Sequence, residues 1–133
     1  MSSGVAVKMM LGLLVCVMIF HLSIIVKLIP YQITWGGRLK SDTEMYVFET
    51  ISILINLLLF FAVLIKEAYV KAFIPLKAVN AILWSFIGLF GLNTIGNIFA
   101  ETNIEKSFSL LTLISVVLLW IIIRNSKSES KPK

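Results

Sequence analysis

The chain contains little charge, one histidine and one cysteine. Only 14% of its 133 residues are Asp, Glu, Lys or Arg, whereas 59% are apolar, a balance outside the range of soluble domains. A single cysteine, Cys16, excludes an internal disulfide, and we expect it to pack in the core. Cys16 and His21 lie on different helix faces and provide no metal site. The composition therefore indicates a membrane protein without a metal or other cofactor.

Motifs of catalysis and of nucleic-acid binding are also missing. Ser52, Ser109 and Thr112 carry hydroxyl groups, but no nucleophile elbow or assured base accompanies them. A reaction that uses the two carboxylates of Glu49 and Glu101 is chemically conceivable, although nothing in their spacing requires it. The net charge of +5 comes with no groove-reading or phosphate-cradling motif. We therefore expect neither an enzyme nor a nucleic-acid-binding protein.

Four long apolar runs occupy most of the sequence. A bilayer core of about 30 Å requires about 20 apolar residues per helix, and unbroken runs favour helices over a barrel of alternating strands. The first run is too long for a secretory signal and no small-x-small cleavage site follows it, so we interpret it as a retained anchor. The predicted spans are residues 7–29, 45–65, 78–100 and 107–123.

Short connections join these spans. They make consecutive spans antiparallel neighbours, which predicts an all-α, up-down four-helix bundle in one transmembrane domain, residues 1–124. Ser41 and Glu44 have the spacing of a capping box at the start of the second helix. The lysines of the connection at 66–77 are expected to meet anionic lipid headgroups of the bilayer. The tail, residues 125–133, has too little apolar surface to fold, and we expect it to be disordered.

Lys and Arg are divided unevenly between the two sides of the predicted bundle. Eight of the 12 lie on the side that holds both termini, and four lie on the opposite side. The positive-inside rule therefore predicts cytoplasmic N- and C-termini in the plasma (inner) membrane. We interpret the net basicity as a signal of topology.

Strong polar side chains gather in the outer half of the predicted spans, whereas the inner half is nearly all hydrocarbon. A carboxylate costs about 2.5–3.5 kcal/mol at the middle of a membrane helix, so it usually faces protein or water. The sequence therefore predicts an outward-facing polar cavity. Its polar residues are His21, Lys27, Glu49, Asn56, Asn93, Asn97, Glu101 and Thr112.

Two polar stripes are expected to line this cavity. The stripe on the second helix has members three and four residues apart, namely Glu49, Ser52 and Asn56. The stripe on the third helix has members at four-residue steps, namely Asn93, Asn97 and Glu101. Asn and Ser pairs also join membrane helices at about 0.6 kcal/mol each, so a purely structural role is the alternative.

The first connection adds cations near the cavity. Trp35 precedes two glycines and Arg38, which predicts either a tight turn or a loop that aims Arg38 at an acidic partner. Lys27 can extend toward the interface or turn inward. His21 is expected to be a packing histidine with one hydrogen bond.

Three segments resemble those of small, uncharacterised four-span bacterial membrane proteins. They are residues 33–40, 44–49 and 92–100. The resemblance covers most of the chain between the first and fourth helices and implies no activity. Small multidrug exporters share the size and the number of spans, but their acidic residue lies within the first helix, where this chain has none.

Three functions remain as hypotheses. The first is the binding or sensing of a small polar or cationic molecule by Glu49, Asn56, Asn93, Asn97, Glu101 and Arg38, supported by His21, Lys27, Ser52 and Trp35. The second is a small transporter or channel-like protein, in which a homo-oligomer supplies polar groups on both sides of the midplane. The third is a structural or accessory subunit of a membrane complex.

Overall fold

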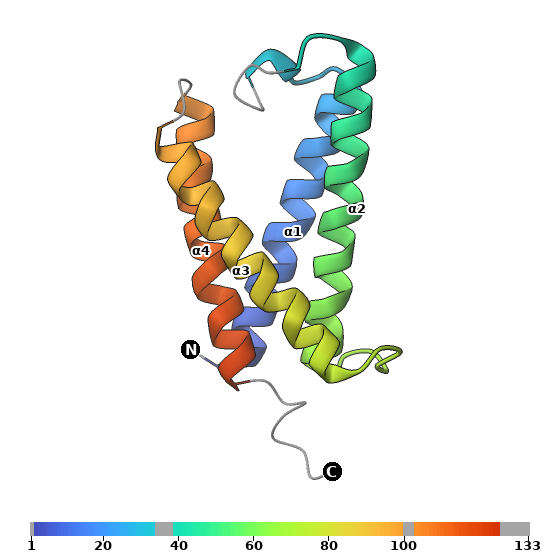
Figure 1. Ribbon diagram of the computed structural model, residues 1–133, viewed down its shortest axis with the longest axis vertical. Helices are drawn as coiled ribbons and strands as arrows, with labels where there is room; N and C mark the ends of the chain where they lie inside the picture. The colour runs from blue at the N-terminus through green and yellow to red at the C-terminus, as the bar shows by residue number, and fades with distance from the viewer. Residues whose placement is uncertain (1, 34–38, 100–102, 126–133) are drawn as a thin grey trace.

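The architecture is all-helical. A computed structural model of the chain describes residues 2–33, 39–99 and 103–125. Trp35, Arg38, Glu101 and most of the predicted tail lie outside these ranges. Within them the elements are α1 (Ser3–Ile25), η1 (Tyr31–Ile33), α2 (Asp42–Lys66), α3 (Leu76–Ile98) and α4 (Asn103–Asn125) (Figure 1).

The four long helices confirm the prediction of four apolar segments of membrane length. Each is long and apolar enough to cross a bilayer. The predicted bounds differ most at α1, which has the expected 23 residues but begins and ends four residues earlier than predicted. α2, α3 and α4 each begin two to four residues before the predicted span.

A backbone motif explains why α1 ends at Ile25. The amide of Leu28 donates to the Ser23 carbonyl at 2.9 Å, and the amide of Lys27 donates to the Ile24 carbonyl at 3.0 Å. These two bonds form a Schellman motif, with Lys27 in the left-handed region at φ 65°. Apolar character continues to Ile29, so hydropathy alone placed the end of the helix too late.

The same motif ends α2. Tyr69 donates to the Leu64 carbonyl at 2.9 Å, and Ala68 donates to the Ile65 carbonyl at 3.0 Å. Ala68 occupies the left-handed position at φ 64°, where helices that end in this motif usually carry glycine. Its Cβ therefore strains this turn.

The start of α2 confirms the predicted N-cap. The Ser41 hydroxyl accepts from the Glu44 amide at 3.2 Å. The Glu44 carboxylate reaches back to the Lys40 amide at 3.1 Å, one residue before the amide that a standard capping box uses. Two backbone donors at this exposed helix end are satisfied by side chains.

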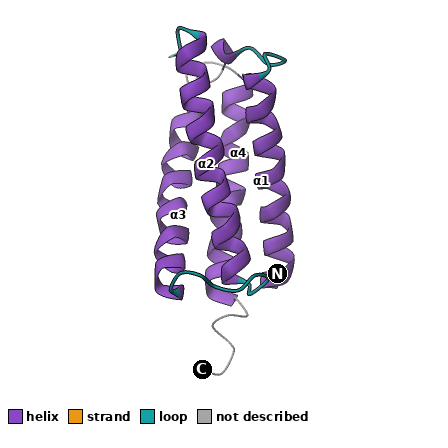
Figure 2. Cartoon of the chain, turned by 90° about the vertical axis from the view of Figure 1, so that its right-hand side faces the viewer, coloured by secondary structure: helices purple, strands orange, loops and turns teal. Residues whose placement is uncertain are grey.

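The helices alternate in direction, and each packs against the next one in the sequence (Figures 1 and 2). α1 also packs against α4. We call the end where α1 begins and α4 ends the termini end, and the opposite end, where α1 ends and α2 begins, the distal end.

The hydrophobic core is concentrated near the termini end. All four helices contribute to one cluster there, with Met10 of α1, Leu59 of α2, Leu83 of α3 and Leu119 of α4 fully or almost fully buried. The distal end holds a small cluster built from Ile24, Leu39 and Met45, which belong to α1, the first connection and α2. Four-helix packing therefore holds together one end of the molecule.

Toward the distal end, α3 separates from α2 (Figure 1). Val79, Phe86 and Asn93 are seven residues apart and share one face of α3. Val79 and Phe86 are buried, whereas Asn93 is exposed. One face of α3 is thus covered near the termini end and uncovered near the distal end, at the point where its polar residues begin.

The strained turn after α2 gives a stability prediction. Ala68→Gly removes the Cβ from a left-handed position, and we expect it to raise the free energy of unfolding by about 0.5–1 kcal/mol. Ala81→Gly makes the same chemical change inside α3, where it is expected to lower that free energy by about 1 kcal/mol. Reversible unfolding in detergent measures both. A lower free energy of unfolding in Ala68→Gly would contradict the claim that the Ala68 Cβ strains the turn.

Candidate functional site

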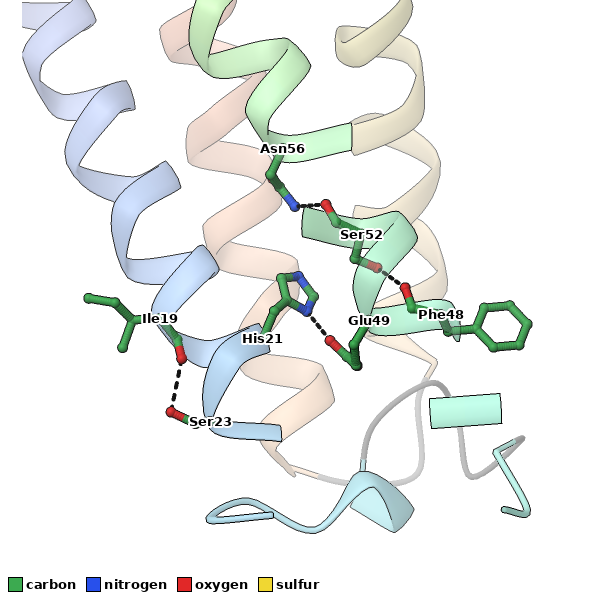
Figure 3. Close-up of polar contacts among 7 residues, drawn as sticks. All are labelled: Ile19, His21, Ser23, Phe48, Glu49, Ser52 and Asn56. Carbon is green, nitrogen blue, oxygen red and sulfur yellow. Dashed lines mark hydrogen bonds and ion pairs between the residues drawn. The ribbon is translucent and has the colours of Figure 1, made fainter. Parts of the chain in front are cut away.

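The distal end brings together His21 of α1 and Glu49 of α2. The carboxylate oxygen Oε2 of Glu49 contacts Nδ1 of His21, and the two side chains point toward one another (Figure 3). Glu49 is 0% exposed and the His21 side chain is 15% exposed. A carboxylate removed from solvent requires a hydrogen-bonded or charged partner, and His21 supplies one from the neighbouring helix.

The surroundings of this pair are apolar and aromatic. Met45 lies one turn before Glu49 on α2, Ile24 lies one turn after His21 on α1, and both are buried. The Phe20 ring stands edge-on to the His21 ring, with centroids 6.0 Å apart. The low polarity of these neighbours strengthens the His21–Glu49 interaction.

Ser52 and Asn56 continue the α2 stripe, and their side chains bond to their own helix. The Ser52 hydroxyl donates to the Phe48 carbonyl at 2.9 Å, and the Asn56 amide donates to the Ser52 carbonyl at 2.7 Å (Figure 3). Ser52 is buried and Asn56 is half-buried. The Ser52 hydroxyl and one N–H of the Asn56 amide are therefore used within α2.

The α3 stripe lies on a more open surface. Asn93 is exposed and Asn97 is half-buried. Between them, the Thr94 hydroxyl lies 2.7 Å from the Thr112 hydroxyl of α4. Sequence reasoning singled out Thr112 but missed Thr94, whose partner is 18 residues away. This bond joins α3 to α4, whereas the Glu49 contact joins α2 to α1.

Lys27 has a different role from the inward-pointing cation that the sequence allowed. Its ammonium group lies 2.6 Å from the Asp42 carboxylate, with side chains 55% and 50% exposed. The hydrogen bond and the charge of Asp42 raise the pKa of Lys27 above its ordinary value of 10.5. The pair links the end of α1 to the start of α2 at the surface, where salt screens it.

The termini end contains buried charges that sequence reasoning missed. Lys66 is 0% exposed and donates to the Asn80 Oδ1 of α3 at 2.5 Å. Glu67 is 1% exposed and accepts a hydrogen bond from the Ser3 hydroxyl of α1 at 3.2 Å. Both residues follow the predicted second span, so they do not test the expectation of an apolar inner half. The expectation that Lys66 meets lipid headgroups is wrong, because its side chain is buried.

One signal in the sequence indicates the burial of Lys66. Leu59, Val63 and Lys66 follow Asn56 at three- and four-residue steps, so Lys66 ends the same stripe that begins at the distal end. The other lysines of that connection, Lys71 and Lys77, are exposed as expected.

The remaining expectations concern metals and cysteine. Among the described residues, no group of three His, Cys, Asp or Glu side chains could hold a metal ion. Cys16 is exposed on α1, so the expectation that it packs in the core is wrong. A groove of about 270 Å³ between α1 and α4 is lined only by apolar side chains, among them Met9 and Val117, and contains no predicted site residue.

The buried pair gives a second prediction. His21→Leu removes the hydrogen-bonding group that α1 supplies to the buried Glu49 carboxylate, and we expect a loss of about 3 kcal/mol in the free energy of unfolding. The double variant His21→Leu with Glu49→Met removes both polar groups and is expected to recover most of that loss. Chemical unfolding in detergent measures the free energy of unfolding of wild type, His21→Leu and the double variant. Equal stability of wild type and His21→Leu would show that the pair contributes nothing.

No protein-family model, curated protein or solved structure matches this chain. The site is therefore interpreted from its own geometry.

Proposed function

We propose that the chain is a multi-pass protein of the bacterial plasma membrane that binds or senses a small polar or cationic molecule at its distal end. The observation that carries this proposal is the fully buried Glu49 carboxylate, which His21 of the adjacent helix contacts. The segments that resemble small four-span bacterial membrane proteins favour the same assignment to a membrane.

Charge at the two ends supports an arrangement with both termini in the cytoplasm. The termini end exposes Lys8, Lys71, Lys77 and Arg124. It contains one acidic residue among the described residues, Glu67, and that residue is buried. Positive residues favour the cytoplasmic side of a membrane helix, which makes the distal end the outer end.

The chemistry of the site favours a cationic molecule. Glu49 presents an acceptor that carries negative charge when ionised, and His21 is the more exposed member of the pair. An incoming ammonium group can replace His21 as the partner of Glu49, because both supply an N–H donor. Asn93 and Asn97 offer amide groups on the uncovered face of α3 and would bind the polar part of the molecule.

A transporter is the second candidate function. Alternating access requires polar groups near both sides of the membrane. Buried polar side chains occur at both ends here, with Glu49 at the distal end and Lys66 and Glu67 at the termini end. Uptake of the bound molecule into vesicles that contain the purified protein would favour transport over binding alone. An accessory subunit, the third candidate, would tolerate Glu49→Gln without any loss of phenotype.

A ligand-library thermal shift tests the binding function. Wild-type protein in detergent is screened with small protonated amines, and with quaternary ammonium compounds and neutral polar molecules as comparisons that lack a charged N–H donor. We expect stabilisation by a subset of the cations, and a loss of at least tenfold in affinity for them in Glu49→Gln, because the neutral amide cannot balance a cationic charge.

Glu44→Gln is the matched control for this screen. It makes the same change at an exposed residue of the same helix, and its capping interaction tolerates glutamine. Its ligand profile is expected to equal that of wild type. Identical ligand profiles of wild type and Glu49→Gln would overturn the proposed function and favour a structural or accessory subunit.

A further inference from the structure

The buried carboxylate at the termini end has an oxygen with no partner. Oε1 of Glu67 accepts the hydrogen bond from Ser3, whereas Oε2 is buried and has no hydrogen-bond partner in the described part of the chain. Glu67 is 1% exposed. A buried acceptor without a partner costs about 1–3 kcal/mol, and more when it carries charge. An oxygen in this state requires either a proton of its own or a bound group that the described residues do not supply.

Glu67 and Glu49 occupy equivalent places at the two ends of one helix interface. They are 18 residues apart in α2, and their α1 partners Ser3 and His21 are also 18 residues apart. Eighteen residues make five helical turns, so each pair of residues lies on one helix face, about 27 Å apart. The interface between α1 and α2 therefore carries one buried carboxylate at each end.

The two carboxylates differ in the charge that their partners can supply. His21 can carry a proton and a positive charge, whereas the Ser3 hydroxyl is neutral. Lys66, the adjacent cation, directs its ammonium group to Asn80 of α3. Among the described residues, Ser3 is hydrogen-bonded to Glu67, and no positive side chain forms an ion pair with it.

The position of Glu67 on the helix adds to its negative potential. Glu67 is the C-cap residue of α2, next to the negative end of the helix dipole. This end attracts cations and disfavours an isolated carboxylate. The exposed lysines nearby, Lys8, Lys71 and Lys77, are hydrated, and salt screens their repulsion over about 8 Å at physiological ionic strength.

We propose that Glu67 and Ser3 form a cation site at the termini end that binds a compact monovalent ion such as Na⁺ or K⁺. Carboxylate and hydroxyl oxygens are the ligands that hard cations prefer. The ion supplies the positive charge that Ser3 lacks, and it binds Oε2 of Glu67, the oxygen that has no hydrogen-bond partner among the described residues. A water molecule would complete the hydrogen bonding of Oε2 but would leave the buried charge unbalanced.

The test measures the thermal stability of the full chain in detergent at constant pH and ionic strength. NaCl or KCl replaces choline chloride in steps, because the methyl groups of choline keep its charge away from carboxylate and hydroxyl oxygens. We expect one of the two ions to raise the melting temperature of the wild type by about 4 °C at saturation. Glu67→Gln is expected to lose this response, and Ser3→Ala to shift its midpoint to about tenfold higher salt.

Two further variants separate this site from the outer one. Glu49→Gln and Glu44→Gln are expected to keep the full response to the ion, whatever the result of the ligand screen. No response in wild type, or an undiminished response in Glu67→Gln, would overturn the proposal. If Glu67→Gln fails to fold, the Ser3→Ala titration decides, since an unchanged midpoint would also overturn it.

Discussion

The contact between Glu49 and His21 is the interaction on which the distal end depends. A carboxylate inside an apolar helix interface requires hydrogen-bonded or charged partners, and α1 supplies His21 as one of them. The contact therefore fixes the register of α1 against α2 at the end where the four-helix core is absent. The small cluster of Ile24, Leu39 and Met45 and the surface pair of Lys27 with Asp42 lie around it and close the same hairpin.

α2 connects the neighbouring helices α1 and α3. At its C-terminal end Lys66 bonds to α3 and Glu67 bonds to α1, so this end of α2 contacts both neighbours through buried polar groups. At its N-terminal end the polar contact is with α1, while α3 bonds to α4 through Thr94 and Thr112. Polar bonds and core packing thus join the helices at the termini end. At the distal end the polar bonds join α1 to α2 and α3 to α4, and the rings of Phe20 and Phe108, with centroids 5.1 Å apart, connect α1 with α4.

The sequence predicted the four helices because hydrocarbon thickness imposes a minimum length of apolar segment, and it predicted the start of α2 from Ser41 and Glu44. It also placed Glu49 and His21 in one half of the spans. It did not predict that they contact each other, since 28 residues separate them. The hydrogen bonds of Lys66 and Glu67 were missed for the same reason, because their partners are 14 and 64 residues away. The end of α1 depends on the left-handed conformation of Lys27, which composition does not reveal.

The central claim is that His21 and Glu49 contact each other inside the membrane domain, and nitrogen-15 NMR tests it most directly. The chain has one histidine, so selective labelling of histidine reports on His21 alone. We predict that the Nδ1 resonance of His21 in lipid bilayers shifts when Glu49 is changed to Gln and stays unchanged when Glu44 is changed to Gln. An Nδ1 resonance that is the same in all three proteins would contradict the contact and the site built on it.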